Sequence, residues 1–160
     1  MSRRILSKEY EENGFRVVIV GTYWDVQDKE RNKSILEGLR RIREREDKII
    51  FVGDFNAHME EIDGRNNWNG SVLREFIKKE RLINVNVTNK CRGKYTWSRN
   101  GVETVIDCFL VDENLWKEVT GMRIDENKEV DVKSGHNFME LSVGVRKKFE
   151  KRRREKERQK

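Results

Sequence analysis

A carboxylate and an amide, which phosphate or metal chemistry requires, stand directly after an apolar run. The run at residues 49–52 is followed directly by Gly53, Asp54, Phe55 and Asn56. Side chains alternate along an extended backbone, so Asp54 and Asn56 should project to one side and Phe55 to the other. A carboxylate and an amide would then share one pocket, at the strand end where open α/β sheets bind ligands. The alternative is a plain turn, because Gly, Asp and Asn are common turn formers.

A second carboxylate and a histidine are candidates for the same pocket. Asp107 lies inside the run TVIDCFLV, where an ionised carboxylate is costly unless it has a partner or faces a polar cleft. His136 stands in SGHN, and a loop there could deliver it to that cleft. The alternatives are an aspartate on an exposed strand face and a surface histidine. The other histidine of the chain, His58, follows the GDFN motif and is interpreted as a loop residue.

The hydropathy pattern predicts the sheet that would position these residues. Short apolar runs at 15–22 and 49–52 indicate buried strands, and between them Asp28 can cap an amphipathic helix. A second helix is predicted at about 71–80, with Ser71 as its cap. The stretches LINVNV, KYTW, TVIDCFLV and FMELSVGV are expected to be extended. We therefore predict the α/β class, as an α+β mixed sheet with flanking helices.

The composition fits a single domain with a strongly charged surface. The chain has 160 residues, of which 40% are charged and 35% hydrophobic. No apolar run has the length needed to cross a bilayer, and the first residues lack the apolar stretch of a secretory signal. Cys91 and Cys108 follow no metal-ligand spacing, so both are interpreted as reduced, packed thiols. We expect an intracellular protein, nuclear if functional, with no membrane partner.

The positive charge is concentrated at the end of the chain. Residues 146–160 hold ten Lys or Arg and three Glu, so this tail has a net charge of +7. The whole chain has a net charge of +6, so residues 1–145 sum to −1. Such a segment is typical of a solvated helix or linker, or of a contact with phosphates. We divide the chain into a lead-in at 1–14, a domain at 15–145 and this basic tail. Any DNA contact is expected to be with the backbone and sequence-independent.

The order of these motifs resembles the C-terminal half of the endonuclease/exonuclease/phosphatase superfamily, in particular the endonuclease domains of LINE-type retrotransposons. The resemblance covers residues 15–145, which would be a partial domain. It rests on a tyrosine closing a strand (VIVGTY), GDFN followed by Ala-His, then TW, IDCFLV, and SGHN where the family has SDHN. It implies half of a four-layer α/β sandwich and metal-dependent hydrolysis of DNA phosphodiesters.

The resemblance also implies a catalytic role for five residues. Asp54 would orient and activate the attacking water, and Asn56 would hold the phosphate or that water. Tyr23 falls where the family places a tyrosine hydroxyl against the scissile phosphate. Asp107 would pair with His136 and fix its tautomer, so that the imidazole can donate to a phosphate oxygen.

Substrate contacts beyond these are fewer. Trp97 in KYTW resembles a tryptophan of the family that packs in the core or faces DNA. Arg65 and Asn67 lie in the stretch DGRNNWNG and could meet a DNA backbone, although that stretch also has the composition of a turn-rich loop.

The resemblance implies Mg²⁺, but the sequence offers few ligands for it. The family's principal metal ligands lie in the N-terminal half, which has no counterpart here, and Gly135 occupies the place of the SDH aspartate. We therefore assign no metal ligand and expect an endonuclease-type domain that is impaired by itself, with a missing N-terminal half or a second copy as a further partner. The alternative is a non-catalytic remnant, or a weak nucleic-acid- or protein-binding module.

Overall fold

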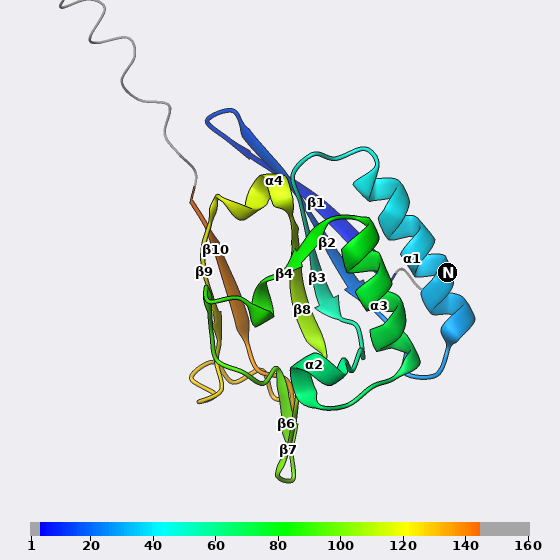
Figure 1. Cartoon of the computed structure of the whole chain (residues 1–160). Helices are drawn as coiled ribbons and strands as arrows, with labels where there is room; N and C mark the ends of the chain where they lie inside the picture. The colour runs from blue at the N-terminus through cyan, green and yellow to red at the C-terminus, as the bar shows by residue number, and fades with distance from the viewer. Residues whose placement is uncertain (1–3, 145–160) are drawn as a thin grey trace, which may run out of the picture.

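The computed structural model describes residues 4–144, and its centre is a five-stranded mixed sheet (Figure 1). The strand order is β1-β2-β3-β8-β4, in which β2 and β3 are parallel and the other neighbours antiparallel. The register places Tyr23 beside Asp54 and Asp54 beside Asp107, so three candidate residues meet at one edge. The bounds are β1 (Ile5–Glu12), β2 (Phe15–Tyr23), β3 (Ile49–Asp54), β8 (Asp107–Asp112) and β4 (Leu82–Asn84).

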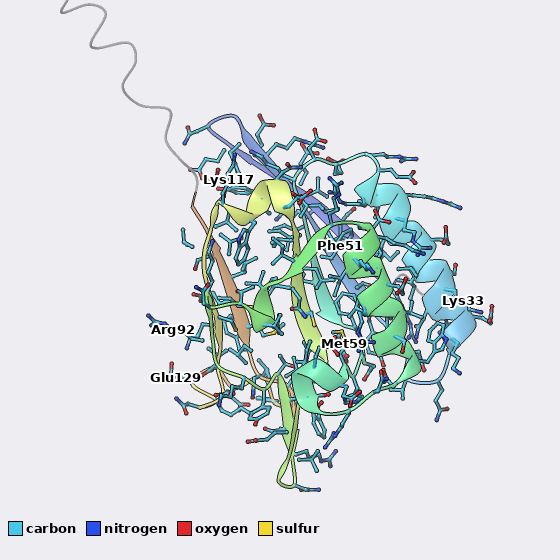
Figure 2. The ribbon with its side chains drawn as sticks, viewed as in Figure 1. Lys33, Phe51, Met59, Arg92, Lys117 and Glu129 are labelled. Carbon is cyan, nitrogen blue, oxygen red and sulfur yellow. The ribbon has the colours of Figure 1, made fainter. Side chains whose placement is uncertain are left out.

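Two helices, α1 (Lys29–Arg43) and α3 (Trp68–Lys79), cover one face of this sheet (Figure 1). Apolar side chains of the strands meet the apolar side of each helix, and this contact forms the larger core. Phe51 of β3 packs edge to face on Phe76 of α3, with ring centroids 5.5 Å apart. Figure 2 shows Phe51 between sheet and helix, whereas Lys33 extends from α1 into solvent.

Of the two predicted helix caps, one is confirmed and one is wrong. Asp28 caps α1, as predicted, because its carboxylate accepts the N–H of Arg31 at 3.0 Å. The cap predicted at Ser71 is wrong, since α3 begins earlier. Asn67 is the cap, and its side-chain oxygen accepts the N–H of Gly70 at 2.7 Å. Asn67 supplies the oxygen three residues before that N–H, so the helix starts there and Ser71 falls within the first turn.

A smaller sheet, with strand order β10-β9-β5, packs on the other face of the central sheet (Figure 1). Its bounds are β5 (Cys91–Arg92), β9 (Val119–Ile124) and β10 (Met139–Val143). Val17 and Ile50 of the central sheet contribute to a second core with the inward side chains of β9. The described part therefore has three layers, and the predicted mixed sheet with flanking helices is confirmed.

Short elements gather at the end of the sheet where β3 finishes (Figure 1). After β3 the chain forms the one-turn helix α2, and a two-stranded hairpin, β6–β7, projects from the same end. The stretch LINVNV, predicted to be extended, is divided between β4 and a 3₁₀ turn, and a second one-turn helix, α4, follows β8 at the opposite end of the sheet (Figure 1). The bounds are α2 (Glu60–Asp63), β6 (Trp97–Arg99), β7 (Val102–Thr104), α4 (Glu113–Trp116) and the 3₁₀ turn (Val85–Val87).

The proposed division of the chain meets the structure at its two ends. Most of the segment set apart as a lead-in, residues 1–14, is occupied by β1, which pairs with β2 along its whole length. The basic tail at 146–160 lies outside the described residues. Among residues 4–144, no helix has both the length and the apolar character to span a membrane.

Candidate active site

The GDFN motif ends β3 in a sharp turn that depends on its glycine and asparagine. A Cβ atom at Gly53 would lie 1.8 Å from the carbonyl oxygen of Thr22, so only glycine lets β3 approach β2 this closely. Asn56 has a left-handed backbone with φ of 43°. Its N–H donates to Oδ1 of Asp54 at 2.9 Å, and this hydrogen bond fixes the carboxylate beside the turn.

Three groups from distant parts of the sequence converge at this strand end. Nδ1 of His136 lies 2.9 Å and 3.1 Å from the two carboxylate oxygens of Asp107, and Nε2 lies 3.8 Å from Oδ2 of Asp54. An ionised carboxylate can only accept, so the hydrogen bond to Asp107 places a proton on Nδ1. The pairing of Asp107 with His136 that the resemblance implied is therefore present in the geometry.

Side chains that sequence reasoning did not single out hold Asp107 and His136 in place. The buried hydroxyl oxygen of Thr96 accepts the N–H groups of Ile106 and Asp107 at 3.0 Å and 3.1 Å. The Thr96 carbonyl accepts the N–H of Asn137 at 2.7 Å, which fastens the histidine loop to the residue directly before β6. Lys128 donates to the His136 carbonyl at 2.8 Å. The only signal in the sequence was the position of Thr96 directly before a tryptophan.

The surroundings of the cluster raise the pKa values of both carboxyl groups. Burial and the charge of Asp107 raise the pKa of Asp54 to about 6, although the Asn56 N–H and His136 act in the opposite direction. Burial also raises the pKa of Asp107, against the charge and hydrogen bond of His136 and the hydrogen bond with Thr96. Two carboxyl groups with raised pKa values in one place are a feature of catalytic and metal-binding sites.

Buried amides lock the turn that carries Asn56. The Asn56 side chain donates to the carbonyl of Trp24 at 2.8 Å. Asn69, at the start of α3, donates to the carbonyl oxygens of Asp25 at 3.0 Å and Asn56 at 3.3 Å. Asn32 of α1 donates in turn to the Asn69 side chain at 3.0 Å. Both helix starts therefore hold the loop after β2 and the loop after β3 together.

The remaining predicted residues differ in how close they come to the cluster. Tyr23 ends β2 beside Asp54, with its ring exposed and the Arg4 guanidinium 4.7 Å from the ring centroid. Trp97 forms an isolated bridge with His136. Arg65 lies exposed after α2, and among residues 4–144 the structure shows no hydrogen bond from its side chain to the cluster.

The space at Gly135 is filled by Trp97. A Cβ atom at Gly135 would lie 2.4 Å from Nε1 of Trp97, so the indole stands where an aspartate side chain would begin. Asn67, the other residue considered for a DNA contact, turns inward and donates to the Asn56 carbonyl at 2.8 Å. Its side-chain oxygen also accepts the N–H of His58 at 3.0 Å, so Asn67 joins the loop to the helix.

The donor set can be compared with what a divalent cation needs. Within the described residues, Asp54, Asp107 and His136 are the group whose ligand atoms all lie within 4.8 Å of one another. Mg²⁺ is bound by one or two carboxylates with water or phosphate oxygens completing its shell, and the carboxylates of Asp54 and Asp107 fit that requirement. A cation would also offset the repulsion that raises the pKa of Asp54. Sequence reasoning had assigned no ligand.

Solved structures share this fold. The endonuclease domain of TRAS1, a telomere-specific non-LTR retrotransposon, superposes with a TM-score of 0.73 at 21% identity, covering 89% of this chain and 64% of that one. The AP endonuclease LMAP from Leishmania major gives 0.69 at 16%, covering 89% and 55%. A 3′ phosphatase, NExo from Neisseria bound to a product DNA hairpin, gives 0.70 at 16%, covering 89% and 65%. This chain thus spans less than two thirds of each.

These likenesses establish the endonuclease/exonuclease/phosphatase fold, which is the class that the sequence motifs predict. The family described as endonuclease-reverse transcriptase matches residues 17–140. The chain belongs to this family, and the resemblance to retrotransposon endonuclease domains is confirmed. Among curated proteins, no match was found.

Proposed function

We propose that this chain is a retrotransposon-derived endonuclease-type domain that hydrolyses DNA phosphodiester bonds with the help of a divalent cation. The convergence of Asp54, Asp107 and His136 at the end of β3 carries the proposal. A carboxylate with a pKa of about 6 can accept a proton near neutral pH, and the imidazole beside it can donate one. The DNA hairpin bound to the Neisseria relative supports a nucleic-acid substrate.

Each side chain has a distinct role in this reaction. Asp54 orients the attacking water and accepts its proton as the new P–O bond forms and the bond to the leaving sugar oxygen breaks. Asn56 holds Asp54 through its N–H and positions the phosphate or the water. With both ring nitrogens protonated, His136 donates from Nε2 to a phosphate oxygen as negative charge grows there, and Asp107 is the positioning residue for His136. Tyr23 places its hydroxyl beside the phosphate.

The cation would be held by carboxylate oxygens of Asp54 and Asp107. Bound there, Mg²⁺ supplies neutralisation of the phosphate charge. One of these two carboxylates, Asp107, already accepts a hydrogen bond from His136, which leaves Asp54 as the ligand with fewer competing contacts. Because the described residues offer the cation so few free ligand atoms, we expect cleavage by the chain alone to be slow.

Nicking of supercoiled plasmid at micromolar protein over several hours tests the proposal. We expect slow nicking with Mg²⁺ that stops with a chelator and in Asp54→Ala, while Lys33→Ala on the far side of α1 serves as the matched control. Nicking that persists in Asp54→Ala would contradict the assigned role. If no variant nicks but DNA is still bound, the chain is a binding module.

A further inference from the structure

A second histidine–aspartate pair lies outside the proposed active site. Nδ1 of His58 is 2.7 Å from Oδ2 of Asp63, and the hydroxyl of Thr104 donates to the same oxygen at 2.6 Å. The other carboxylate oxygen accepts the N–H of Arg65 at 3.2 Å. The pair therefore links the β3–α2 connection to β7 of the hairpin.

The carboxylate of this pair is fully buried and ionised. Only 1% of the Asp63 side chain is exposed. Burial raises the pKa of Asp63, but hydrogen bonds from Thr104 and His58 and the charge of His58 outweigh it and hold the pKa below its ordinary value. An ionised carboxylate accepts the Nδ1 proton of His58, so the imidazole has a fixed orientation.

The opposite nitrogen of the ring is directed to solvent. The His58 side chain is 25% exposed, and within residues 4–144 Nε2 neither has a hydrogen-bond partner nor is among the buried atoms that lack one. When both ring nitrogens carry protons, Nδ1 donates to Asp63 and Nε2 is a charge-assisted donor that nothing in the described fold uses. His136 is arranged in the same way, with Nδ1 on a buried aspartate.

His58 and the proposed active site are also rigidly connected. Asn67 accepts the N–H of His58 and donates to the carbonyl of Asn56, so one amide spans both positions. His58 lies four positions after Asp54, which limits their backbone separation to about 14 Å. A DNA strand advances about 3.4 Å per nucleotide, so both positions fall within roughly four nucleotides of one strand.

We propose that His58 is a second phosphate-binding position, which takes a phosphate of the same nucleic-acid strand a few nucleotides from the one held at Asp54. This inference rests on the proposed function for the identity of the ligand. Asp63 and Thr104 are its positioning residues, because they fix the imidazole and leave Nε2 free.

Two substitutions at the same position separate phosphate binding from a purely structural clamp. In His58→Asn the amide nitrogen replaces Nδ1 and keeps the bond to Asp63, but nothing replaces Nε2. In His58→Gln the longer side chain places its amide nitrogen near the position of Nε2 and loses the bond to Asp63. We therefore expect His58→Asn to retain stability and His58→Gln to retain more of the binding.

The measurement uses the full chain with chelator present, so that no cleavage is required. A labelled DNA duplex is titrated at pH 6 over a range of salt concentrations. We expect His58→Asn to melt as the unmodified chain does but to bind about fivefold more weakly, with the salt slope reduced by about one. We expect His58→Gln to melt earlier and to retain more of the affinity.

A second measurement tests the site without DNA. The chain has two histidines, so the Nε2 NMR signal of His58 can be assigned by its loss in His58→Asn, and inorganic phosphate should shift that signal whether or not it also shifts the signal of His136. An unshifted signal, or unchanged affinity and salt slope in His58→Asn, overturns the proposal and leaves His58 as a clamp. Failure of Mg²⁺-dependent nicking would contradict the proposed function without altering either result.

Discussion

At the scale of single residues, burial determines which side chains can do chemistry. Asp54, Asp107 and Asp63 are all withdrawn from water, yet their hydrogen bonds set them apart. Asp63 receives enough donors to remain a stable anion, whereas Asp54 receives one backbone N–H and faces a second carboxyl group. The first arrangement suits an orienting residue and the second suits a proton acceptor.

The raised pKa of Asp54 predicts a pH-dependent stability. The native pKa of about 6 exceeds the ordinary value of 3.8, so the native state binds more protons than the unfolded state between these limits. Stability should fall as pH rises through that window and level off above it. Asp54→Asn keeps the acceptor for Asn56 and removes the charge, so it should stabilise the chain at pH 7.5 by about 1–2 kcal/mol after allowance for solvent screening.

Urea denaturation of both proteins at pH 4 and pH 7.5 measures this effect. The two curves should separate at pH 7.5 and converge at pH 4, where Asp54 is protonated in the native state. A gap of equal size at both values would show that the substitution acts through packing rather than through charge.

The contact between Gly135 and Trp97 predicts the result of restoring an aspartate. In Gly135→Asp the new Cβ displaces the indole, and such overpacking costs about 1–3 kcal/mol. We expect lower stability and no gain in nicking. Gly135→Ala introduces the same Cβ without charge and should lose a similar amount. A double-mutant cycle with Trp97→Ala should give a favourable coupling, whereas additive effects would mean that the indole is not the obstacle.

At the scale of elements, the starts of α1 and α3 act as a support for the turn after β3. Asn69→Ala removes donors to the carbonyls of Asp25, Phe55 and Asn56. Asn32 still donates to the Asp25 carbonyl and Asn67 to the Asn56 carbonyl, so of these three the Phe55 carbonyl loses its donor, and we expect a cost of about 1–3 kcal/mol. The Asn56 turn should also loosen, so its N–H lowers the pKa of Asp54 less and that pKa rises further.

Carboxyl ¹³C NMR titration of Asp54 in Asn69→Ala separates this role from general destabilisation. The control is Ser71→Ala on the exposed side of the same helix, where the hydroxyl donates to the Asn67 carbonyl at 3.3 Å. It should leave the titration of Asp54 unchanged. Equal titration curves for Asn69→Ala and the unmodified chain would confine Asn69 to a purely structural role.

How much of the molecule the sequence could predict depends on the kind of interaction. Apolar periodicity located β2, α1, β3 and α3, because burial of one face leaves a repeating pattern. It missed β1, whose residues are mostly exposed and charged and whose position depends on pairing with β2. Motif order pointed to Asp54, Asp107 and His136. Thr96 and Asn69 were missed, because a buried hydroxyl or amide leaves no periodic signal.

At the scale of the whole molecule, the second sheet covers only part of the central one. Val17 of β2 is buried beneath it, whereas Ile19 on the same face is 36% exposed. In the register of β1 and β2, Leu6 pairs with Gly21 and Tyr10 with Val17, so both side chains belong to this face. Leu6 is 69% exposed. The β1–β2 side of the sheet therefore presents apolar side chains to water, next to a strand edge that has no partner in the described fold.

This uncovered face predicts self-association of the full chain. An apolar patch beside an open strand edge favours pairing with another copy, since that contact removes the patch from water and pairs the edge. Light scattering across a concentration series should show an apparent mass that rises with concentration, together with binding of a hydrophobic dye. Leu6→Lys combined with Ile19→Lys should lower both. Leu36→Ala, a core substitution on the buried side of α1, should reduce stability without reducing association. A chain that stays monomeric at every concentration and binds no dye would contradict the prediction.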